Sequence, residues 1–345
     1  SRIRGNHWRS IKRAEGIVRF SEKRQTLKPQ HYCGVASWYD IDDVALVEFH
    51  SKANALDGDS MSMLDDAIDA VESRSMRGLI VHNDAQHFSC GVNLQVVRDF
   101  FRRDDLDGLN AFLAHFQQVV HRMANLTLPV VAAPAGLSIG GGFEVVLHAK
   151  QVICHANSTM GLVESMVGVV PGGGGCKETL YRWIDQLQCG EDISKACWKA
   201  FMNLGYGKTA SSPIIAQQIA MLRANDRFLI NRDRLYTEAF KAIDDTSSQI
   251  KFERPALTMP GAPLFKEMCE WLAKSRDKGI FTPHDVVVGT EMARIVTGGD
   301  VAPGTVMNEQ DFYDAERASF LRLISTDATR TRIESMLDSG SPVRN

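Results

Sequence analysis

The alternation of short apolar runs with segments of helical periodicity constrains the fold of this chain most. Residues 44–50 (VALVEFH) and 78–83 (GLIVHN) are β-rich runs, and apolar residues recur at helical spacing between them, over residues 60–73. The alternation continues with apolar runs at 130–136 (VVAAPAG) and 151–156 (QVICHA). Strands that alternate with helices predict an α/β fold with largely parallel strand pairing.

Beyond about residue 205 the pattern becomes mainly helical. No internal repeat or low-complexity tract interrupts it. We expect helices within 212–224, 231–246, 263–276, 283–297 and 308–338, because these segments have helix-compatible periodicity.

Charge and composition exclude several classes of protein. The net charge of −3 is nearly balanced, which argues against a nucleic-acid partner. The seven cysteines are scattered without zinc-site spacing, and the histidines form no metal spacing either; His148 is expected to be a packing or solvent residue. No apolar run approaches the ~20 residues that a membrane span needs. We therefore expect a cytoplasmic protein with no structural metal and no membrane partner.

Three glycines at 140–142 lead into a helix, expected to be amphipathic, that carries Glu144. Consecutive glycines suit a place where the backbone must approach a ligand closely. An N–H group at the start of a helix also donates well toward an oxyanion. The alternative is a tight strand-to-helix turn with Glu144 as a favourable first-turn acid, and this segment alone does not distinguish the two.

A second glutamate, Glu164, lies among apolar residues in the stretch 160–170. Its carboxyl group is either desolvated, with a raised pKa suited to proton transfer, or turned outward to water. The glycines at 172–175 lack the GK[ST] ending of a phosphate loop, and SIGGGFE lacks the third glycine of a dinucleotide fingerprint. Nucleotide hydrolysis and NAD binding are therefore disfavoured.

Four motifs occur in a fixed order over roughly residues 35–205. They are SKANAL (51–56), FSCGVNL (88–94), LSIGGGFEVVLHA (137–149) and MGLVESMVGVVPGGGG (160–175). Together they resemble the crotonase, or enoyl-CoA hydratase/isomerase, superfamily. The resemblance implies an α/β fold of the crotonase type, a spiral of repeated ββα units, here with an extended helical C-terminal region.

The flanking segments extend the resemblance. INRDRL (230–235) and the ending RIESMLDSGSPVRN are similar to the C-terminal hydratase half of bacterial bifunctional 3-hydroxyacyl-CoA dehydrogenase/enoyl-CoA hydratase proteins. We expect residues 1–30 to be a linker or N-terminal extension, 31–205 a crotonase-like catalytic core and 206–345 a helical C-terminal region. The expected partner is a 3-hydroxyacyl-CoA dehydrogenase, either separate or as a missing N-terminal half. Because superfamily members commonly form trimers, we also expect a homo-oligomer, trimer-based or dimeric.

The resemblance assigns roles residue by residue. Glu144 would act as the base on a water molecule, and Glu164 would return a proton to the α-carbon of the substrate. The N–H groups of Val92 and Gly141 would form an oxyanion hole for the thioester carbonyl. No cofactor is implied, since CoA is part of the substrate. The implied substrate-binding residues are Lys52, Asn54, Cys90, Gly91, Gly140 and Gly172.

Two residues depart from the superfamily pattern. Val92 and Asn93 stand where most members have Ala and Asp. The side chain of Val92 is expected to narrow the acyl pocket, and Asn93 removes a charge near the oxyanion hole. The alternative for both is lineage variation without a functional effect.

The function that the resemblance implies is hydration of a trans-2-enoyl-CoA to a 3-hydroxyacyl-CoA, in fatty acid β-oxidation or a related acyl-CoA pathway. Isomerisation of a Δ3- to a Δ2-enoyl-CoA is the alternative, but it needs only one base, so the presence of Glu144 and Glu164 together favours hydration. A non-catalytic module that holds a partner dehydrogenase is a third hypothesis, which the presence of both glutamates and Gly141 disfavours. A related acyl-CoA lyase or hydrolase would reuse the same enolate chemistry.

Overall fold

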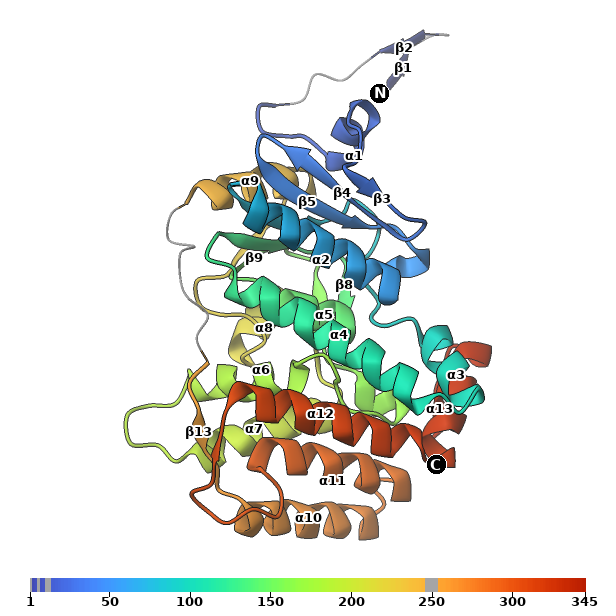
Figure 1. Ribbon diagram of the computed structural model, residues 1–345, viewed down its shortest axis with the longest axis vertical. Helices are drawn as coiled ribbons and strands as arrows, with labels where there is room; N and C mark the ends of the chain where they lie inside the picture. Colours follow the sequence, from blue (N-terminus) through green and yellow to red (C-terminus); the bar gives the residue numbers. More distant parts are fainter. Residues whose placement is uncertain (1, 5–6, 10–13, 246–253) are drawn as a thin grey trace.

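The computed structural model describes residues 2–4, 7–9, 14–245 and 254–345, and its upper half in Figure 1 is built on a mixed β-sheet. Within those ranges the sheet has seven strands in the order β12-β9-β7-β6-β5-β4-β3. Neighbours from β5 to β12 pair in parallel, whereas β3 and β4 are antiparallel additions. This confirms the predicted α/β fold with largely parallel pairing. The strands are β3 (His31–Tyr32), β4 (Ala36–Ile41), β5 (Val44–Phe49), β6 (Gly78–His82), β7 (Val130–Ala133), β9 (Gln151–His155) and β12 (Arg227–Leu229).

Both faces of this sheet are covered by helices, which explains why its central strands are mainly apolar on both faces. Successive side chains of a strand point to opposite faces, so Val44 and Leu46 pack beneath α9 (Leu235–Asp244). Ala45 and Val47 belong to the larger core on the other face. That face is covered by α2 (Gly58–Ser73), on which α4 (Leu106–Asn125) packs in turn, and the buried strands are those of a sheet enclosed on both sides.

A second, three-stranded sheet positions the two motifs that carry Glu144 and Glu164. Strand β10 (Thr159–Gly161) lies between β8 (Leu137–Ile139), to which it is parallel, and β11 (Thr209–Ala210). Strand β8 leads directly into Gly140 and helix α5 (Gly141–Leu147), and β10 leads to Glu164. Because β8 and β10 are adjacent and parallel, their carboxyl ends bring both glutamate segments to one edge of the sheet.

The C-terminal helices form a layer below the sheet in Figure 1. Helix α12 (Glu309–Ile324) lies against α11 (Pro283–Thr297), and α13 (Asp327–Ser339) lies beside α3 (Leu94–Arg102). The other helices of this layer are α6 (Gly175–Ile184), α7 (Ile193–Gly205) and α10 (Ala262–Asp277), and a short β13 (Leu257–Thr258) pairs with β14 (Val306–Met307).

Two of the segments expected to be helical are not single helices over their length. Segment 308–338 contains two helices, because the Thr326 side chain accepts a hydrogen bond from the N–H of Thr329 and begins a new helix there. The segment 212–224 is helical only in α8 (Pro213–Gln218), after which the chain turns toward β12.

The expected boundaries at residues 30 and 205 fall close to segments that pack on the main sheet. In α1 (Phe20–Lys23), the ring of Phe20 is buried at 5.1 Å from that of Tyr39. Beyond residue 205, β12 extends the seven-stranded sheet and α9 covers it. Residues 206–345 are therefore mainly but not purely helical, and the three-part division remains a prediction. A further pair of strands, β1 (Arg2–Arg4) and β2 (His7–Arg9), is antiparallel.

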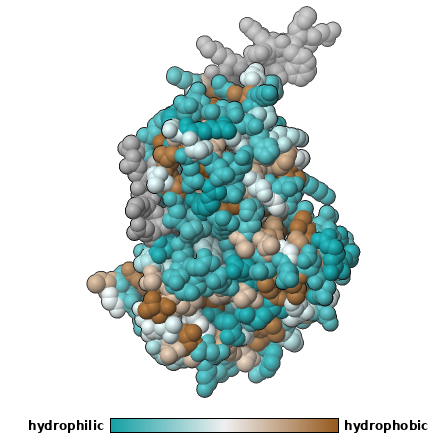
Figure 2. Space-filling model, in the orientation of Figure 1, coloured by the Kyte–Doolittle hydropathy of each residue, from teal (hydrophilic) through white to brown (hydrophobic). Residues whose placement is uncertain are grey.

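Figure 2 shows one face of the molecule, on which hydrophilic residues cover most of the sheet-containing half. Apolar residues are more frequent over the C-terminal helices in the lower half of the view. Exposed apolar side chains in that region of the chain include Ile280 and Val287. Scattered exposure of this kind is common on protein surfaces, so the expected oligomer remains a prediction.

Candidate active site

Most of the predicted site residues line one cavity of about 140 Å³ at the carboxyl ends of β8 and β10. The cavity could hold several water molecules, each of which needs roughly 10–15 Å³ on this measure. The predicted residues that line it are Cys90, Gly91, Val92, Gly140, Gly141, Glu144, Glu164 and Gly172.

Lys52 and Asn54 do not line this cavity. They lie on a short 3-10 turn, η2 (Lys52–Asn54), where Lys52 is exposed and Asn54 is buried. The Asn54 side chain donates a hydrogen bond to the carbonyl of His87 at 2.9 Å, and the carbonyl of Ala53 accepts from the N–H of Cys90. The turn is thus hydrogen-bonded to the segment 87–90, which carries Cys90. A substrate contact by Lys52 or Asn54 remains a prediction.

The backbone N–H groups of Val92 and Gly141 meet at the cavity. Leu56 pairs with the residues on both sides of Val92, because its N–H donates to the Gly91 carbonyl and its carbonyl accepts from the Asn93 N–H. The N–H of Val92 therefore points to the opposite side, toward the cavity. Gly141 begins helix α5, where N–H groups lack an intrahelical acceptor. Within the described ranges, neither N–H donates a hydrogen bond to protein.

Glu144 lies in the first turn of α5 with its side chain buried. Its Oε1 accepts two hydrogen bonds, from the N–H of Gly173 at 2.8 Å and from that of Gly175 at 2.9 Å. Burial raises the pKa of Glu144 to about 7, although the two hydrogen bonds oppose the shift. Every residue of α5 is buried, so the prediction of an amphipathic helix here is wrong.

Glu164 begins the 3-10 turn η3 (Glu164–Val167) and has a different environment. The residue as a whole is partly exposed, but its Oε2 is enclosed and has no hydrogen-bond partner in the part of the chain that the structure describes. Burial, and then the charge of nearby Glu144, raise the pKa of Glu164 well above its ordinary value. The sequence left open whether this carboxyl group is desolvated or turned outward to water, and in the structure it is desolvated.

A third buried carboxyl group, that of Glu316 on α12, meets the same glycine-rich turn. Its two oxygens accept hydrogen bonds from the N–H groups of Gly174 and Lys177, both at 2.7 Å. The N–H groups that open α6 are thus occupied by carboxylates of the chain itself, which explains why the phosphate-loop interpretation fails. Sequence reasoning missed Glu316, because it lies 142 residues from Gly174 and within an ordinary helical pattern.

Beneath the turn lies a network of buried charges. The ammonium group of Lys177 is fully buried and contacts Glu178 at 2.9 Å, Glu309 at 2.5 Å and the Tyr313 hydroxyl at 3.0 Å. His148 hydrogen-bonds the same hydroxyl through Nε2 at 3.1 Å. Burial lowers the pKa of His148 to about 3, so the ring is neutral; of the two expected roles, packing or solvent exposure, it has the first.

Apolar side chains from four helices surround the rest of the cavity. No Lys, Arg or His is among the described residues that line it. Helices α3 and α4 supply one wall, and the C-terminal helices α12 and α13 supply the other. The principal residues are Leu94, Phe112, Phe116, Phe320, Ile333 and Met336.

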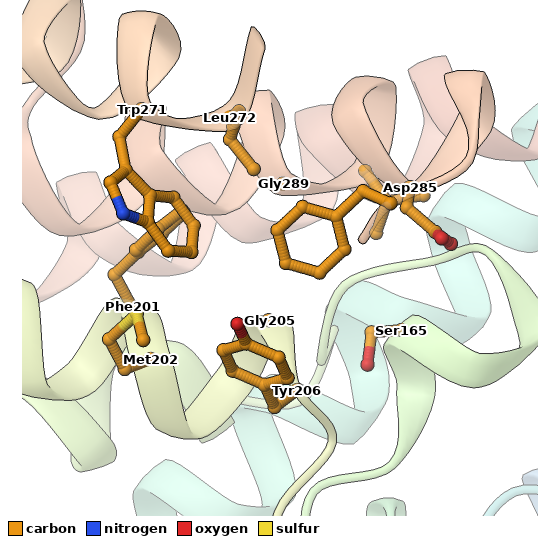
Figure 3. A pocket seen from close by; sticks show the side chains of 11 residues that line it. Ser165, Phe201, Met202, Gly205, Tyr206, Trp271, Leu272, Asp285 and Gly289 are labelled. Atoms are coloured by element: carbon orange, nitrogen blue, oxygen red, sulfur yellow. The ribbon is translucent and has the colours of Figure 1, made fainter. Parts of the chain in front are cut away.

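Figure 3 shows a second hollow, which is lined by Ser165 of η3. Its aromatic wall is formed by Phe201, Tyr206 and Trp271, and Ser165 and Asp285 line the opposite side. The hollow measures about 20 Å³. That volume suits one or two water molecules and excludes an acyl group.

The described residues contain no group of three or more His, Cys, Asp or Glu side chains that could hold a metal ion. No helix in the same ranges is both long and apolar enough to cross a membrane.

Comparison with known proteins supports the resemblance seen in the sequence. Residues 41–189 match the sequence model of the enoyl-CoA hydratase/isomerase family. This part of the chain is similar to the crotonase superfamily. A crystal structure of an enoyl-CoA hydratase from Bacillus halodurans has a TM-score of 0.58, covers 88% of this chain and 100% of its own, and is 15% identical. A crystal structure of an enoyl-CoA hydratase/isomerase from Mycobacterium paratuberculosis also has a TM-score of 0.58. It covers 88% of this chain and 98% of its own, and is 14% identical in sequence. These structures confirm the expected fold class.

Two relatives are more similar in sequence. A probable 3-hydroxyacyl-CoA dehydrogenase of Bacillus subtilis is 32% identical over 314 residues, which are 90% of this chain and 39% of the Bacillus protein. The mitochondrial methylglutaconyl-CoA hydratase of Homo sapiens is 31% identical over 124 residues, 35% of each chain. The chain therefore spans well under half the length of the first relative, and the resemblance to bifunctional proteins remains a prediction.

Proposed function

We propose that this chain is an enoyl-CoA hydratase, a hydro-lyase that adds water to a trans-2-enoyl-CoA and forms a 3-hydroxyacyl-CoA. One observation carries the proposal: two glutamate side chains from separate elements, Glu144 and Glu164, reach one apolar cavity in different hydrogen-bond environments. Hydration needs a base for the water molecule and an acid for the α-carbon, and this pair can supply both.

The environments of the two carboxyl groups support distinct roles. Glu144 accepts two backbone hydrogen bonds, which stabilise its ionised form, and its pKa is about 7. Oε2 of Glu164 has no hydrogen-bond partner among the described residues, and burial together with the charge of Glu144 raises the pKa of Glu164 well above its ordinary value, which favours its protonated form. Two nearby acids whose pKa values are pushed apart divide naturally into base and acid. Glu144 is then the base and Glu164 the acid.

The proposed reaction conserves atoms and charge. Glu144 removes a proton from water as the water oxygen bonds to C3 of the enoyl group, and the electrons of the double bond move toward the thioester oxygen. The N–H groups of Val92 and Gly141 stabilise that oxyanion, a contribution typically worth ~10²–10³-fold for one donor. Glu164 then protonates C2, and proton exchange with solvent restores both glutamates. In this scheme CoA is part of the substrate, and no metal or cofactor takes part.

The lining of the cavity supports an uncharged acyl group as substrate. An acyl chain that ends in a carboxylate would lose its hydration on entering, and no basic side chain among the described lining residues would compensate. We therefore propose an aliphatic enoyl group attached to CoA, in fatty acid β-oxidation or a related acyl-CoA pathway.

The wider context is also proposed. Similarity to a protein named as a probable 3-hydroxyacyl-CoA dehydrogenase supports such an enzyme as partner or as an attached half, since it would oxidise the product of hydration. A cytoplasmic location and a homo-oligomeric state, trimer-based or dimeric, complete the proposal.

The test compares wild type with Glu144→Gln and Glu164→Gln in the hydration of crotonyl-CoA, followed by the loss of ultraviolet absorbance of the conjugated thioester. Each substitution preserves shape and is expected to lower kcat by ~10²–10⁴-fold. Glu334→Gln, an exposed residue of α13, is the control. If wild type does not hydrate crotonyl-CoA, and the Glu144→Gln variant still isomerises a 3-enoyl-CoA, isomerisation with a single base is favoured instead. Binding of CoA esters without any turnover would favour the non-catalytic module.

A further inference from the structure

Two glutamates share the backbone of one glycine-rich turn. Along the turn, the N–H groups of Gly173 and Gly175 donate to Glu144, whereas those of Gly174 and Lys177 donate to Glu316. The donors therefore alternate between a carboxyl group from the core and one from the C-terminal helix α12. A shift of the turn toward either glutamate would lengthen the hydrogen bonds to the other.

The turn is also held from its carbonyl side. The side-chain amide of Gln117, on α4, donates to the carbonyl of Gly172 at 2.8 Å and to that of Tyr313 at 2.9 Å. Its oxygen accepts from Arg317 of α12 at 2.6 Å. Helix α12 is thus tied to the turn both through Glu316 and through Gln117.

Close packing leaves the turn little freedom to shift. A Cβ atom on Gly174, whose φ is +98°, would lie 2.7 Å from Cε1 of Tyr313. One on Gly175 would lie 2.8 Å from Oε1 of Glu144, and one on Gly173 would lie 2.4 Å from the ring of Phe116. Contacts this short are sterically excluded, so the glycines bring the backbone against both carboxyl groups and leave no gap to absorb a displacement.

We propose that Glu316 is a positioning residue for the catalytic base: it holds the glycine-rich turn so that two N–H groups of that turn stay directed at Glu144. The inference rests on the proposed function, in which Glu144 is the base. Glu316 does not line the cavity, so it acts through the turn and not on the substrate.

Other charged or titratable groups lie around the two carboxyl groups. Glu164 on η3 faces Glu144, and burial together with the charge of Glu144 also raises the pKa of Glu316. The remaining groups, by element, are His148 on α5, Cys176, Lys177 and Glu178 on α6, Glu309 and Tyr313 on α12, and His121 on α4.

The decisive variant is Glu316→Gln, because it keeps the volume of the side chain but sets an NH₂ group against one of the two backbone donors. The turn then moves, and the hydrogen bonds that stabilise the Glu144 carboxylate weaken. We expect kcat to fall roughly 10- to 100-fold while KM changes little, as for a small misplacement of a catalytic group. The acidic limb of the pH profile of kcat should shift to higher pH, since the carboxylate loses stabilising donors.

The matched control is Glu309→Gln, the same substitution on the same helix. Glu309 contacts the Lys177 side chain but no backbone N–H of the turn, so kcat and the acidic limb should stay near wild type. A wild-type kcat and pH profile for Glu316→Gln overturns the proposal. A shift of the acidic limb to lower pH also overturns it, because that result would make Glu316 a source of repulsion and not a positioning residue.

A second measurement separates this proposal from the proposed function. Amide hydrogen exchange of residues 172–178 should be faster in Glu316→Gln than in wild type or Glu309→Gln, whether or not the protein hydrates enoyl-CoA. Exchange that is unchanged in a folded Glu316→Gln protein contradicts the positioning role. A wild type without hydratase activity contradicts the proposed function instead.

Discussion

The two cavity glutamates have different environments, and the pKa values that result should make the reaction depend on pH. Glu144 must be ionised to act as a base, so activity should rise as pH passes through its pKa of about 7. Glu164 must be protonated to act as an acid, so activity should fall again at pH values above its own raised pKa. We expect a bell-shaped profile of kcat/KM against pH, measured with crotonyl-CoA.

The control for this profile is Glu164→Gln. Its residual activity should lose the alkaline limb and keep the acidic one. An acidic limb near the ordinary glutamate pKa in wild type would mean that Glu144 is not the desolvated base.

The close approach of Val92 and Gly141 gives a second prediction. A Cβ atom on Gly141 would lie 2.8 Å from Cγ2 of Val92, so Gly141→Ala must push the two N–H groups apart. We expect kcat to fall ~10²-fold, as when one oxyanion donor is lost. Adding Val92→Ala removes the clashing methyl group and should restore part of the activity. A double variant no better than Gly141→Ala would mean that the contact is not what separates the donors.

Individual site residues were easiest to predict from the sequence where the backbone conformation or the chemistry requires one residue type. The glycines at 140–142 and the two glutamates form short motifs, and the structure brings them to one cavity. The hydrogen bond from the Asn54 side chain to the His87 carbonyl could not be predicted, because local sequence does not reveal which way a side chain faces; a substrate contact by Asn54 remains a prediction. Glu316 has no local signal at all, since its role arises from a contact across the fold.

Helix α13 is the element that ties the C-terminal region to the segment carrying Glu164. The Thr329 hydroxyl donates to the Gly168 carbonyl at 2.7 Å, and Arg332 donates to the Ser165 carbonyl at 3.3 Å. Arg332 is buried and also pairs with Asp285 at 2.8 Å. These contacts hold both ends of η3 against α13.

Removal of this anchor should destabilise the protein measurably. Arg332→Ala leaves Asp285 without its buried partner, and we expect the free energy of unfolding to fall by about 3 kcal/mol. The control is Arg102→Ala, which also breaks an ion pair to α13, with Glu334, but an exposed one; its cost should be below about 1 kcal/mol. Urea unfolding of both variants checks this. Equal losses would show that burial does not distinguish the two pairs.

Elements with strong periodicity and clear caps were predictable from sequence. The expected segment 283–297 matches α11, where Thr282 and Asp285 form a capping box and Gly298 ends the helix. The break between α12 and α13 was not foreseen, because apolar periodicity continues through Ser325 and Thr326. The strand β12 was missed since three residues give too short a pattern, and its pairing with β9 is a tertiary contact.

For the molecule as a whole, the acyl cavity is a joint product of the N-terminal core and the C-terminal helices. Met336 of α13 forms part of its wall, so Met336→Ala should enlarge the space for the acyl chain. We expect the ratio of kcat/KM for a longer enoyl-CoA to that for crotonyl-CoA to rise roughly tenfold, within the range for hydrophobic pockets. Met202→Ala, in the separate hollow of Figure 3, is the control and should leave the ratio unchanged. An unchanged ratio for Met336→Ala would show that this side chain of α13 does not limit the length of the acyl chain.

Glu316 follows Gly174 by 142 positions in the chain, which imposes an order on folding during synthesis. A ribosome completes the sheet and both cavity glutamates long before it adds α12 and α13. Until those helices emerge, the glycine-rich turn lacks one of its two carboxylates and η3 lacks its anchors. A nascent chain at that stage would be partly folded but inactive. Activity should therefore appear only when α12 and α13 have left the exit tunnel of the ribosome.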